Sequence, residues 1–568
     1  MNYEDPSTIS NLFNNYFTDV ANTLFTSSSA SSTLTIVPSF HSFLNNPMPN
    51  SFFCSKITIS ELISTVKLIK PSRTCIGNCI SSTLLKDCIS SIALPLLHIF
   101  NLSFDMGIFP SQLKLSRVTP VFKKGSKTTL SNYRPISSTN PLDFFLEKLM
   151  YSRMMSYINK FEILFDGQFG FRKNFSTAMA VLDVTNMIQN ELYANNYVLG
   201  VFMDLQKAFD TLDFKILLSK LEHYGFRGLS YSWFKSYLEG RSQFTVINGH
   251  DSPLRLVTCG IPQGTVLGPL LFLLFINDIP NSVKDSSIKL FADDSNLFIV
   301  SNSLPALYSL ANKEINSLST WIDANKLYIN YDKTNYMLFQ PKKEIKKNPS
   351  IDKSFLLLIK GHIINRVSVV KYLGIFIDEN LYWHEHIAYL CKKVSSLTGI
   401  LYRVKLFLPT RCKKDIYFAL IHSILIYCIE IYANVSKSIL HPLIVKCNRL
   451  LRLMQSKSRR TPVPELYSTF STIPVDKQFQ FYTIKIIHKF IYDSSKLPTS
   501  IANLFTRCSS VHGHSTRNKD FIFIPSDSNP NSIKFYGPSM WSKLPISLQS
   551  DSNLYSFSRT FKQYLLHH

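Results

Sequence analysis

Acidic residues are scarce in this chain. Its 568 residues include 61 lysines and arginines but only 38 aspartates and glutamates, which gives a net charge of +23 at pH 7. A positive charge of this size indicates a polyanionic partner, and it favours nucleic acid over an anionic membrane surface.

Long hydrophobic runs are also lacking, although hydrophobic residues make up 45% of the sequence and allow a sizeable core. The longest apolar stretches are 266–276, which is too short to span a bilayer, and 417–432, which carries His422 and Glu430. Both are predicted to be buried helices. The N-terminus shows no basic region followed by an apolar core, so no signal peptide and no membrane partner are expected.

Cysteines are few and scattered, ten in all. Cys75 and Cys79 form one C-x3-C pair, but no second Cys/His pair follows at zinc-site spacing. Reduced cysteines in an intracellular protein are therefore expected. No internal repeat of 20–50 residues is present, which excludes solenoids and propellers.

The chain is expected to divide into segments of different composition. Thr58 and Glu61 have capping-box spacing, so a helix should begin at Thr58. Residues 461–464 (TPVP) are interpreted as a linker. The predicted segments are a loosely ordered leader (1–55), a helical extension (56–102), a mixed α+β domain (103–377), a basic helical segment (378–460) and a small, separate C-terminal unit (461–568).

The stretch FADDSNLFIV, residues 291–300, places two carboxylates between two apolar runs. This pattern predicts a β-hairpin with Asp293 and Asp294 at its tip, and the alternative is an ordinary Asp-rich turn. A third carboxylate, Asp204, ends the strand-like run 198–203. Carboxylates at a strand end and a hairpin tip suit a two-metal phosphoryl-transfer site, because Mg²⁺ prefers oxygen ligands.

Several motifs, in this order along the chain, resemble those of reverse transcriptases from non-LTR (LINE-type) retrotransposons of the jockey/CR1 type. The palm-like motifs are F-x-D (202–204), GIPQGTVLGPLLFLLFINDI (260–279) and FADD (291–294). The other matching stretches are SRVTPVFKKG (116–125), NYRPIS (132–137), QFGFRKNFST (168–177), NKLYINYDKT (325–334) and KYLGIFID (371–378).

The resemblance implies an α+β right-hand polymerase fold: fingers and a palm with an antiparallel sheet over 103–377, a helical thumb over 378–460, and a small C-terminal unit. It implies an RNA-directed DNA polymerase that uses an RNA template, a DNA primer, dNTPs and two Mg²⁺ ions, with Mn²⁺ as an alternative. The resemblance also implies an intracellular protein that functions in the nucleus, although the basic runs serve nucleic-acid binding equally well and do not identify a nuclear signal. Too few residues precede the fingers for the endonuclease domain that this family usually carries, so that domain is expected to be lacking.

The resemblance also implies roles for individual residues. Asp204, Asp293 and Asp294 match the catalytic, metal-holding carboxylates. The matches to dNTP-binding residues are Lys123 and Arg134 on the triphosphate, Phe209 as a steric gate against a 2′-hydroxyl, Gln263 as a positioning residue, and Lys333 as a donor to pyrophosphate. Arg172, Arg449 and Arg452 are expected to bind nucleic acid.

Each role has a simpler alternative. Phe209 could be an ordinary core residue, and the basic residues, Lys333 included, could be solvated surface groups. Asp210 and Asp213 are interpreted as helix-start or structural residues.

Two other functions compete with the polymerase. A catalytically silent nucleic-acid-binding relic would keep the charge and the fold without turnover, although the intact aspartates and Gln263 argue against it. An RNA-dependent RNA polymerase shares the two-metal palm, but it must admit a 2′-hydroxyl, which the aromatic residue at position 209 opposes.

Overall fold

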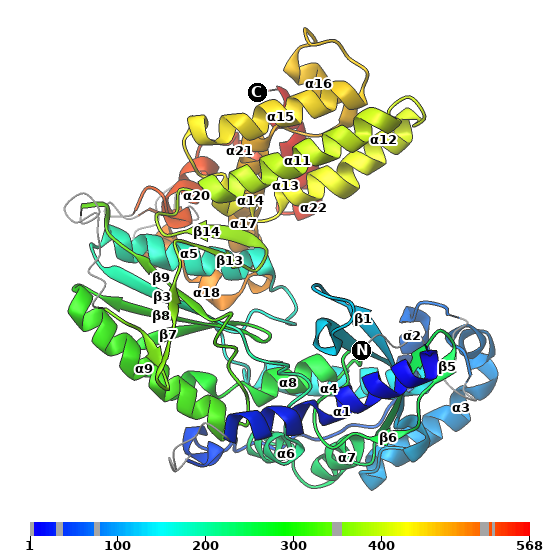
Figure 1. Ribbon diagram of the computed structural model, residues 1–568. Coiled ribbons are helices and arrows are strands. Elements are labelled where there is room, and N and C mark those ends of the chain that lie inside the picture. Colours follow the sequence, from blue (N-terminus) through cyan, green and yellow to red (C-terminus); the bar gives the residue numbers. More distant parts are fainter. Residues whose placement is uncertain are drawn as a thin grey trace.

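The computed structural model describes residues 5–29, 38–72, 80–343, 355–511, 522–524 and 529–567, and Cys75 and Cys79 lie outside these ranges. Helices and strands alternate up to residue 378, and helices dominate from residue 384 onward. The expected mixed α+β class is therefore confirmed. Figure 1 shows a lower part with two sheets and an upper helical part, joined on the left side of the view.

A five-stranded central sheet has the order β12-β9-β3-β8-β7, and only the β12–β9 pair is parallel. Along β3, Leu199 and Val201 face one hydrophobic core while Val198 and Phe202 face another, as the alternation of side chains along a strand requires. The strands are β3 (Tyr197–Met203), β7 (Ser286–Phe291), β8 (Asp294–Ser301), β9 (Asn335–Phe339) and β12 (Asn365–Arg366).

Helices cover both faces of this sheet. α9 (Leu304–Ala324) packs on the Leu199 face, and α5 (Thr177–Tyr193) packs on the Val198 face (Figure 1). Since both faces are buried, residues 198–203 of β3 and 297–300 of β8 form continuous apolar runs. Asp204 follows the first of these strands, and Asp294 begins the second.

A second sheet has the order β2-β1-β4-β5, and β6 also pairs with β4. The β1–β2 pair is antiparallel and the β1–β4 pair is parallel. Its strands are β1 (Leu115–Phe122), β2 (Tyr133–Ser138), β4 (Ser242–Ile247), β5 (His250–Asp251) and β6 (Arg255–Leu256).

Helix α1 (Pro6–Ser29) lies along this second sheet, contacting β4, β5 and β6. Phe13 and Phe17 are buried together with Val118 of β1. The prediction of a loosely ordered leader is therefore wrong for these residues. Serine, asparagine and threonine dominate the segment, but Phe13 and Phe17 are four residues apart and therefore lie on one helical face that packs on the sheet.

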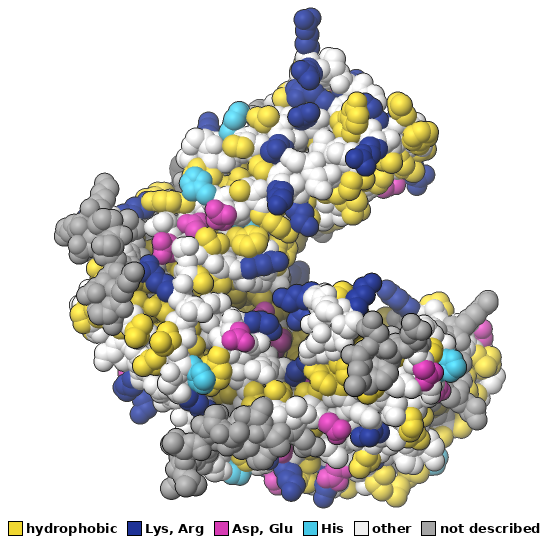
Figure 2. Space-filling model, in the orientation of Figure 1, with side chains coloured by type: hydrophobic (Ala, Val, Ile, Leu, Met, Phe, Trp, Pro, Cys, Tyr) yellow, Lys and Arg dark blue, Asp and Glu magenta, His cyan; other side chains and the backbone are white. Residues whose placement is uncertain are grey.

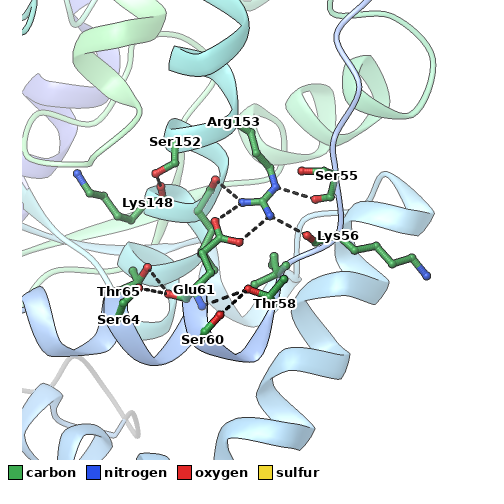
Figure 3. A network of polar contacts seen from close by, with 12 residues as sticks. Ser55, Lys56, Thr58, Ser60, Glu61, Ser64, Thr65, Lys148, Ser152 and Arg153 are labelled. Atoms are coloured by element: carbon green, nitrogen blue, oxygen red, sulfur yellow. Dashed lines mark hydrogen bonds and ion pairs between the residues drawn. The ribbon is translucent and has the colours of Figure 1, made fainter.

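Helix α2 (Ile59–Leu68) begins where the sequence predicts: the Thr58 hydroxyl accepts a hydrogen bond from the Glu61 N–H at 3.2 Å. The Glu61 carboxylate, however, pairs with Arg153 of α4 at 2.7 and 2.9 Å (Figure 3). Arg153 also donates to the carbonyl oxygens of Ser55 and Lys56. This bidentate ion pair fixes α2, which belongs to the helical extension 56–102, against α4 of the α+β domain.

The other helices of the lower part are α3 (Ser82–Met106), α4 (Pro141–Lys160), α6 (Phe214–His223), α7 (Leu229–Leu238) and α8 (Gly268–Phe275).

Within the described part of the chain, α3 is the one helix that is both long enough and apolar enough to cross a membrane, judged by length and composition alone. Of its most apolar 18-residue window, 22% is buried. Its sequence contains no long uninterrupted apolar run, because serines and charged residues divide it. One face, with Leu96, Phe100 and Phe104, packs into the core, and the helix contacts α2 and α7. The prediction of a buried helix at 266–276 is confirmed by α8, whose residues are nearly all buried.

The helical region that follows shares one hydrophobic core with α5 and with the C-terminal helices. The last hundred residues are therefore not a separate unit, since α17 (Val475–Tyr492) packs against α14 (Ile429–Tyr432), α20 (Ile533–Trp541) and α22 (Leu554–His567). The second half of the expected linker at 461–464 is helical, because α16 (Val463–Phe470) starts at Val463. The elements are β10 (Leu358–Ile359), β11 (His362–Ile363), β13 (Val369–Tyr372), β14 (Ile375–Asp378), α11 (His384–Val404), α12 (Thr410–Ile416), α13 (Ser423–Ile426), α14 (Ile429–Tyr432), α15 (Lys437–Met454), α16 (Val463–Phe470), α17 (Val475–Tyr492), α18 (Thr499–Ala502), β15 (Thr506–Arg507), α19 (Cys508–Val511), β16 (Ile522–Phe523), α20 (Ile533–Trp541), α21 (Ile546–Gln549) and α22 (Leu554–His567).

The predicted single helix at 417–432 is broken. It begins with a π-helical turn, Tyr417–His422, and Cys428 interrupts it with a φ of 57°.

Candidate active site

The predicted hairpin is confirmed: β7 and β8 are joined by Ala292 and Asp293 alone. Ala292 has a φ of 54°, and its N–H donates to Oε1 of the buried Gln168 at 3.0 Å. The Gly170 N–H donates to the same oxygen at 2.8 Å, and a Cβ at Gly170 would lie 2.4 Å from the Ala292 nitrogen. Only glycine permits this close approach, which supports the hairpin tip from behind.

Asp204 follows the last residue of β3. Because Met203 pairs with Ser295 in the antiparallel register, the next position places Asp204 opposite Asp294. Oδ2 of Asp204 accepts hydrogen bonds from Asn330 at 3.0 Å and from Lys333 at 3.1 Å. The sheet thus gathers three carboxylates from distant parts of the sequence.

These carboxylates crowd one another. Burial, followed by the charges of Asp293 and Asp204, raises the pKa of Asp294 to about 6. Burial first and Asp204 next also raise the pKa of Asp293. A divalent cation would relieve this repulsion, and carboxylate oxygens suit Mg²⁺. Over the described ranges, however, no three His, Cys, Asp or Glu side chains are grouped as a metal site, and Asp204 instead contacts Lys333 and Asn330.

A cavity of about 880 Å³ opens beside Asp204 and Asp293, and Asp294 is not among the residues that line it. All the residues predicted to bind dNTP line this one cavity: Lys123, Arg134, Phe209, Gln263 and Lys333. The second sheet, the central sheet and the loop before α8 each contribute a wall.

Gln263 is held by a loop that lies between β2 and the residues after Asp204. Its carbonyl oxygen accepts from the Ser137 N–H at 2.7 Å, and the Ile261 N–H donates to the carbonyl of Phe209 at 2.8 Å. Gly264 has a φ of 119°, and a Cβ there would lie 2.6 Å from the carbonyl oxygen of Ser137. Glycine is therefore required for the loop to dock on β2.

Phe209 belongs to both the core and the cavity. Its ring stacks on Phe272 of α8, with centroids 4.2 Å apart and an interplanar angle of 20°, and it meets Phe171 edge-on at 6.4 Å. The stack fixes the plane of the ring, and the ring still lines the cavity. The core and gate interpretations are thus compatible.

Cations crowd the same cavity. Burial, followed by Arg134 and Lys333, lowers the pKa of Lys123. Lys207 is a cavity residue that the sequence analysis missed, and burial likewise lowers its pKa. Its position three residues after Asp204 was the available signal. Positive groups held this close favour a polyanionic ligand such as a triphosphate.

Two further residues were missed or misjudged. Asp210, interpreted as structural, lines the cavity and accepts a hydrogen bond from Nε2 of Gln263 at 2.8 Å. Tyr16 of α1 also lines the cavity, with Nζ of Lys207 at 5.4 Å from its ring centroid. Tyr16 lies in the segment predicted to be a loosely ordered leader, so the sequence gave no signal that it belongs to the site. Asp213 is structural, as expected, because it caps α6.

The three arginines expected to bind nucleic acid lie outside this cavity. Arg172 donates to the carbonyl oxygens of Phe165 and Gln168 and stacks on Phe175 at 4.1 Å. Arg449 is exposed on α15, whereas Arg452 is half-buried and donates to the Thr461 carbonyl. Figure 2 shows a deep hollow between the upper and lower parts, with Lys and Arg side chains along its rim.

Comparison with known proteins agrees with these observations. Residues 122–377 match the family described as "Reverse transcriptase (RNA-dependent DNA polymerase)". The chain is 28% identical over 435 residues to the "RNA-directed DNA polymerase from mobile element jockey" of Drosophila melanogaster, which covers 74% of this chain and 45% of that protein. It is 28% identical over 422 residues to the "Probable RNA-directed DNA polymerase from transposon BS" of the same fly, covering 72% and 46%. The chain therefore spans less than half the length of these relatives.

Proposed function

Since this chain carries a reverse transcriptase domain of the kind found in jockey and related non-LTR retrotransposons, we propose that it is an RNA-directed DNA polymerase. It would extend a DNA 3′-hydroxyl with dNTPs on an RNA template. In this proposal the second sheet belongs to the fingers, the central sheet is the palm, and the helical region from α11 to α15 is the thumb.

One observation carries the proposal. Carboxylates from two strand ends border the same cavity as Lys123, Arg134, Phe209, Gln263 and Lys333. Polymerisation needs these groups together: anionic groups for cations, cationic groups for a triphosphate, and a flat wall for the sugar. A relic that only bound nucleic acid would need the charge but not this grouping.

Asp204, Asp293 and Asp294 would hold two Mg²⁺ ions, with Mn²⁺ as an alternative. When bound, the ions would lower the pKa of the primer hydroxyl and stabilise the leaving pyrophosphate. Asn330 and Lys333 orient the Asp204 carboxylate before substrate arrives. Because the Lys333 side chain is 53% exposed, it is free to pair with a phosphate instead.

The protein's other groups would bind and select the nucleotide. Lys123 and Arg134, which extend from the β1–β2 hairpin, would pair with the triphosphate, and the guanidinium suits bidentate contacts to phosphate oxygens. The Phe209 ring, held flat by Phe272, would lie beneath the sugar. A ring there leaves no room for a 2′-hydroxyl, which favours DNA synthesis over RNA synthesis.

The test is primer extension on an RNA template with purified protein and Mg²⁺. Wild type should extend a DNA primer with dNTPs, and Asp293→Asn should not. Asp213→Asn is the matched control, because Asp213 caps α6 and pairs with Lys326. A wild-type protein that binds the duplex but never extends it would be the silent relic. Equal use of rNTPs would favour an RNA polymerase.

A further inference from the structure

Asp210 has a well-defined place beside the nucleotide cavity. Its N–H donates to the Lys207 carbonyl at 2.8 Å, so a tight turn after Asp204 sets its position. The backbone of Gly260 lies directly against it, since a Cβ at Gly260 would be 2.5 Å from the Asp210 carbonyl oxygen. This close approach brings the Asp210 carboxylate up to the loop that carries Gln263.

The hydrogen bond between them has only one chemically allowed direction. An ionised carboxylate can only accept hydrogen bonds, whereas a glutamine amide has a donor end and an acceptor end. Oδ1 of Asp210 must therefore face Nε2 of Gln263, at 2.8 Å. The amide is then locked with Oε1 turned away from Asp210, and both residues line the cavity.

Nearby groups keep Asp210 charged and in place. Lys207 lies close enough to oppose the rise in the pKa of Asp210 that burial causes, and the pKa remains at about 6. Nζ of Lys207 is held in turn by the ring of Tyr16 and by the Tyr133 carbonyl oxygen at 3.4 Å. Tyr16 of α1 and Tyr133 of β2 thus hold Lys207 beside Asp210, and Asp210 in turn accepts the hydrogen bond from Gln263.

We propose that Asp210 is a positioning residue: by locking the amide of Gln263, it presents the acceptor Oε1 to a hydrogen-bond donor of the bound nucleotide. This inference rests on the proposed polymerase function. It gives Asp210 a role in nucleotide affinity that is absent for Asp213, which lies three residues further along and only caps a helix.

A double-mutant cycle tests the proposal. The variants are Asp210→Asn, Gln263→Met and the pair together, and the substitution to asparagine preserves side-chain volume. The readout is dNTP binding to the full chain on an RNA template with a dideoxy-terminated DNA primer, where chemistry cannot occur. Asp210→Asn frees the amide to rotate and should weaken dNTP binding about tenfold, which is typical for losing a hydrogen bond to a charged group. In the Gln263→Met background the same change should have less than a twofold effect, because there is no amide left to orient.

Asp213→Asn serves as the control and should lower the melting temperature while leaving dNTP affinity unchanged. If the effects of Asp210→Asn and Gln263→Met are additive, Asp210 does not act through Gln263 and the proposal is wrong. An unchanged dNTP affinity in Asp210→Asn would also overturn it. A wild-type protein that neither binds dNTP on this duplex nor extends a free primer would overturn the polymerase function as well, so the two failures are distinguishable.

Discussion

The proposed role of Phe209 in selecting the sugar of the nucleotide gives a sharp test of the site. The ring is half-buried, and its stack on Phe272 at 4.2 Å leaves it little freedom to tilt. In Phe209→Val the flat wall beneath the sugar is lost and a 2′-hydroxyl can be accommodated. Use of rNTPs should rise about tenfold for each ~1.4 kcal/mol of clash removed. Extension with dNTPs should fall much less, because the carboxylates and cations of the cavity remain.

The substitution should leave the protein folded. Losing an aromatic pair costs about 0.5–1.5 kcal/mol beyond the area it buries. The Phe209 ring is only half-buried, so the total should stay near ~2 kcal/mol, below the roughly 3–5 kcal/mol typical of removing a fully buried Phe. A moderate drop in melting temperature is therefore expected.

The assay compares single-nucleotide kcat/KM for dNTP and rNTP in wild type, Phe209→Val and Phe272→Leu. Phe272→Leu keeps the Phe209 ring but removes the aromatic stack that holds it. This variant should therefore lose part of the preference for dNTP over rNTP, although no side chain that lines the cavity has been shortened. If Phe209→Val discriminates as well as wild type, the ring is only a core residue and sugar selection occurs elsewhere.

Four further predictions concern the carboxylates and the basic helix α15. Asp204→Asn should nearly abolish extension, since losing a metal ligand removes several kcal/mol of transition-state stabilisation; normal rates in this variant would refute the site assignment. Asp294→Asn should melt at a higher temperature than wild type at about pH 7.5. The pKa of Asp294 is raised from 3.8 to about 6 in the folded protein, so ionisation of this carboxyl at higher pH destabilises the fold. The difference in melting temperature between wild type and Asp294→Asn should therefore vanish as the pH falls to 3.8, the ordinary pKa of aspartate. A difference that persists at low pH would contradict the repulsion between the carboxylates. Arg449→Ala should reduce the salt dependence of primer–template binding by about one unit of log–log slope. Equal slopes in wild type and Arg449→Ala would mean that α15 does not bind phosphates. Arg452→Ala should instead lower the melting temperature, because the Arg452 guanidinium donates a hydrogen bond to the Thr461 carbonyl oxygen.

The sequence could predict the elements whose cause is local. The hairpin at 286–301 follows from two short apolar runs around an acidic pair, and the start of α2 follows from the Thr58 cap. The continuous apolar run 198–203 likewise predicts that Asp204 lies at the end of a strand. What local pattern could not supply is the partner of each polar group. The spacing of Glu61 suggested a capping box, but a distant arginine was the stronger partner.

The candidate site shows the same contrast between features with a local cause and features that depend on distant parts of the chain. Residues with a family counterpart in the sequence, such as Gln263 and Lys333, could be named as candidates from the sequence alone, and both line the cavity. Asp210 could not be, because its role depends on a loop more than forty positions away in the chain and on the glycine that lets the loop approach. Composition also misled: the serine-rich leader hides α1, since a few aromatic residues on one face are enough to dock a helix.

Helix α1 contributes to the cavity although it precedes the region that matches reverse transcriptases. That region starts at residue 122, yet Tyr16 and Val20 of α1 line the cavity. Buried amides tie the helix to the second sheet, with Asn14 donating to the Pro253 carbonyl at 2.8 Å and accepting from Gln243 at 3.1 Å. Without α1, the apolar surface around Val118 would be exposed to water and Lys207 would lose the ring beneath it. The cavity is therefore built by two parts of the chain, and the apolar face of the second sheet is fully covered only when α1 is packed on it.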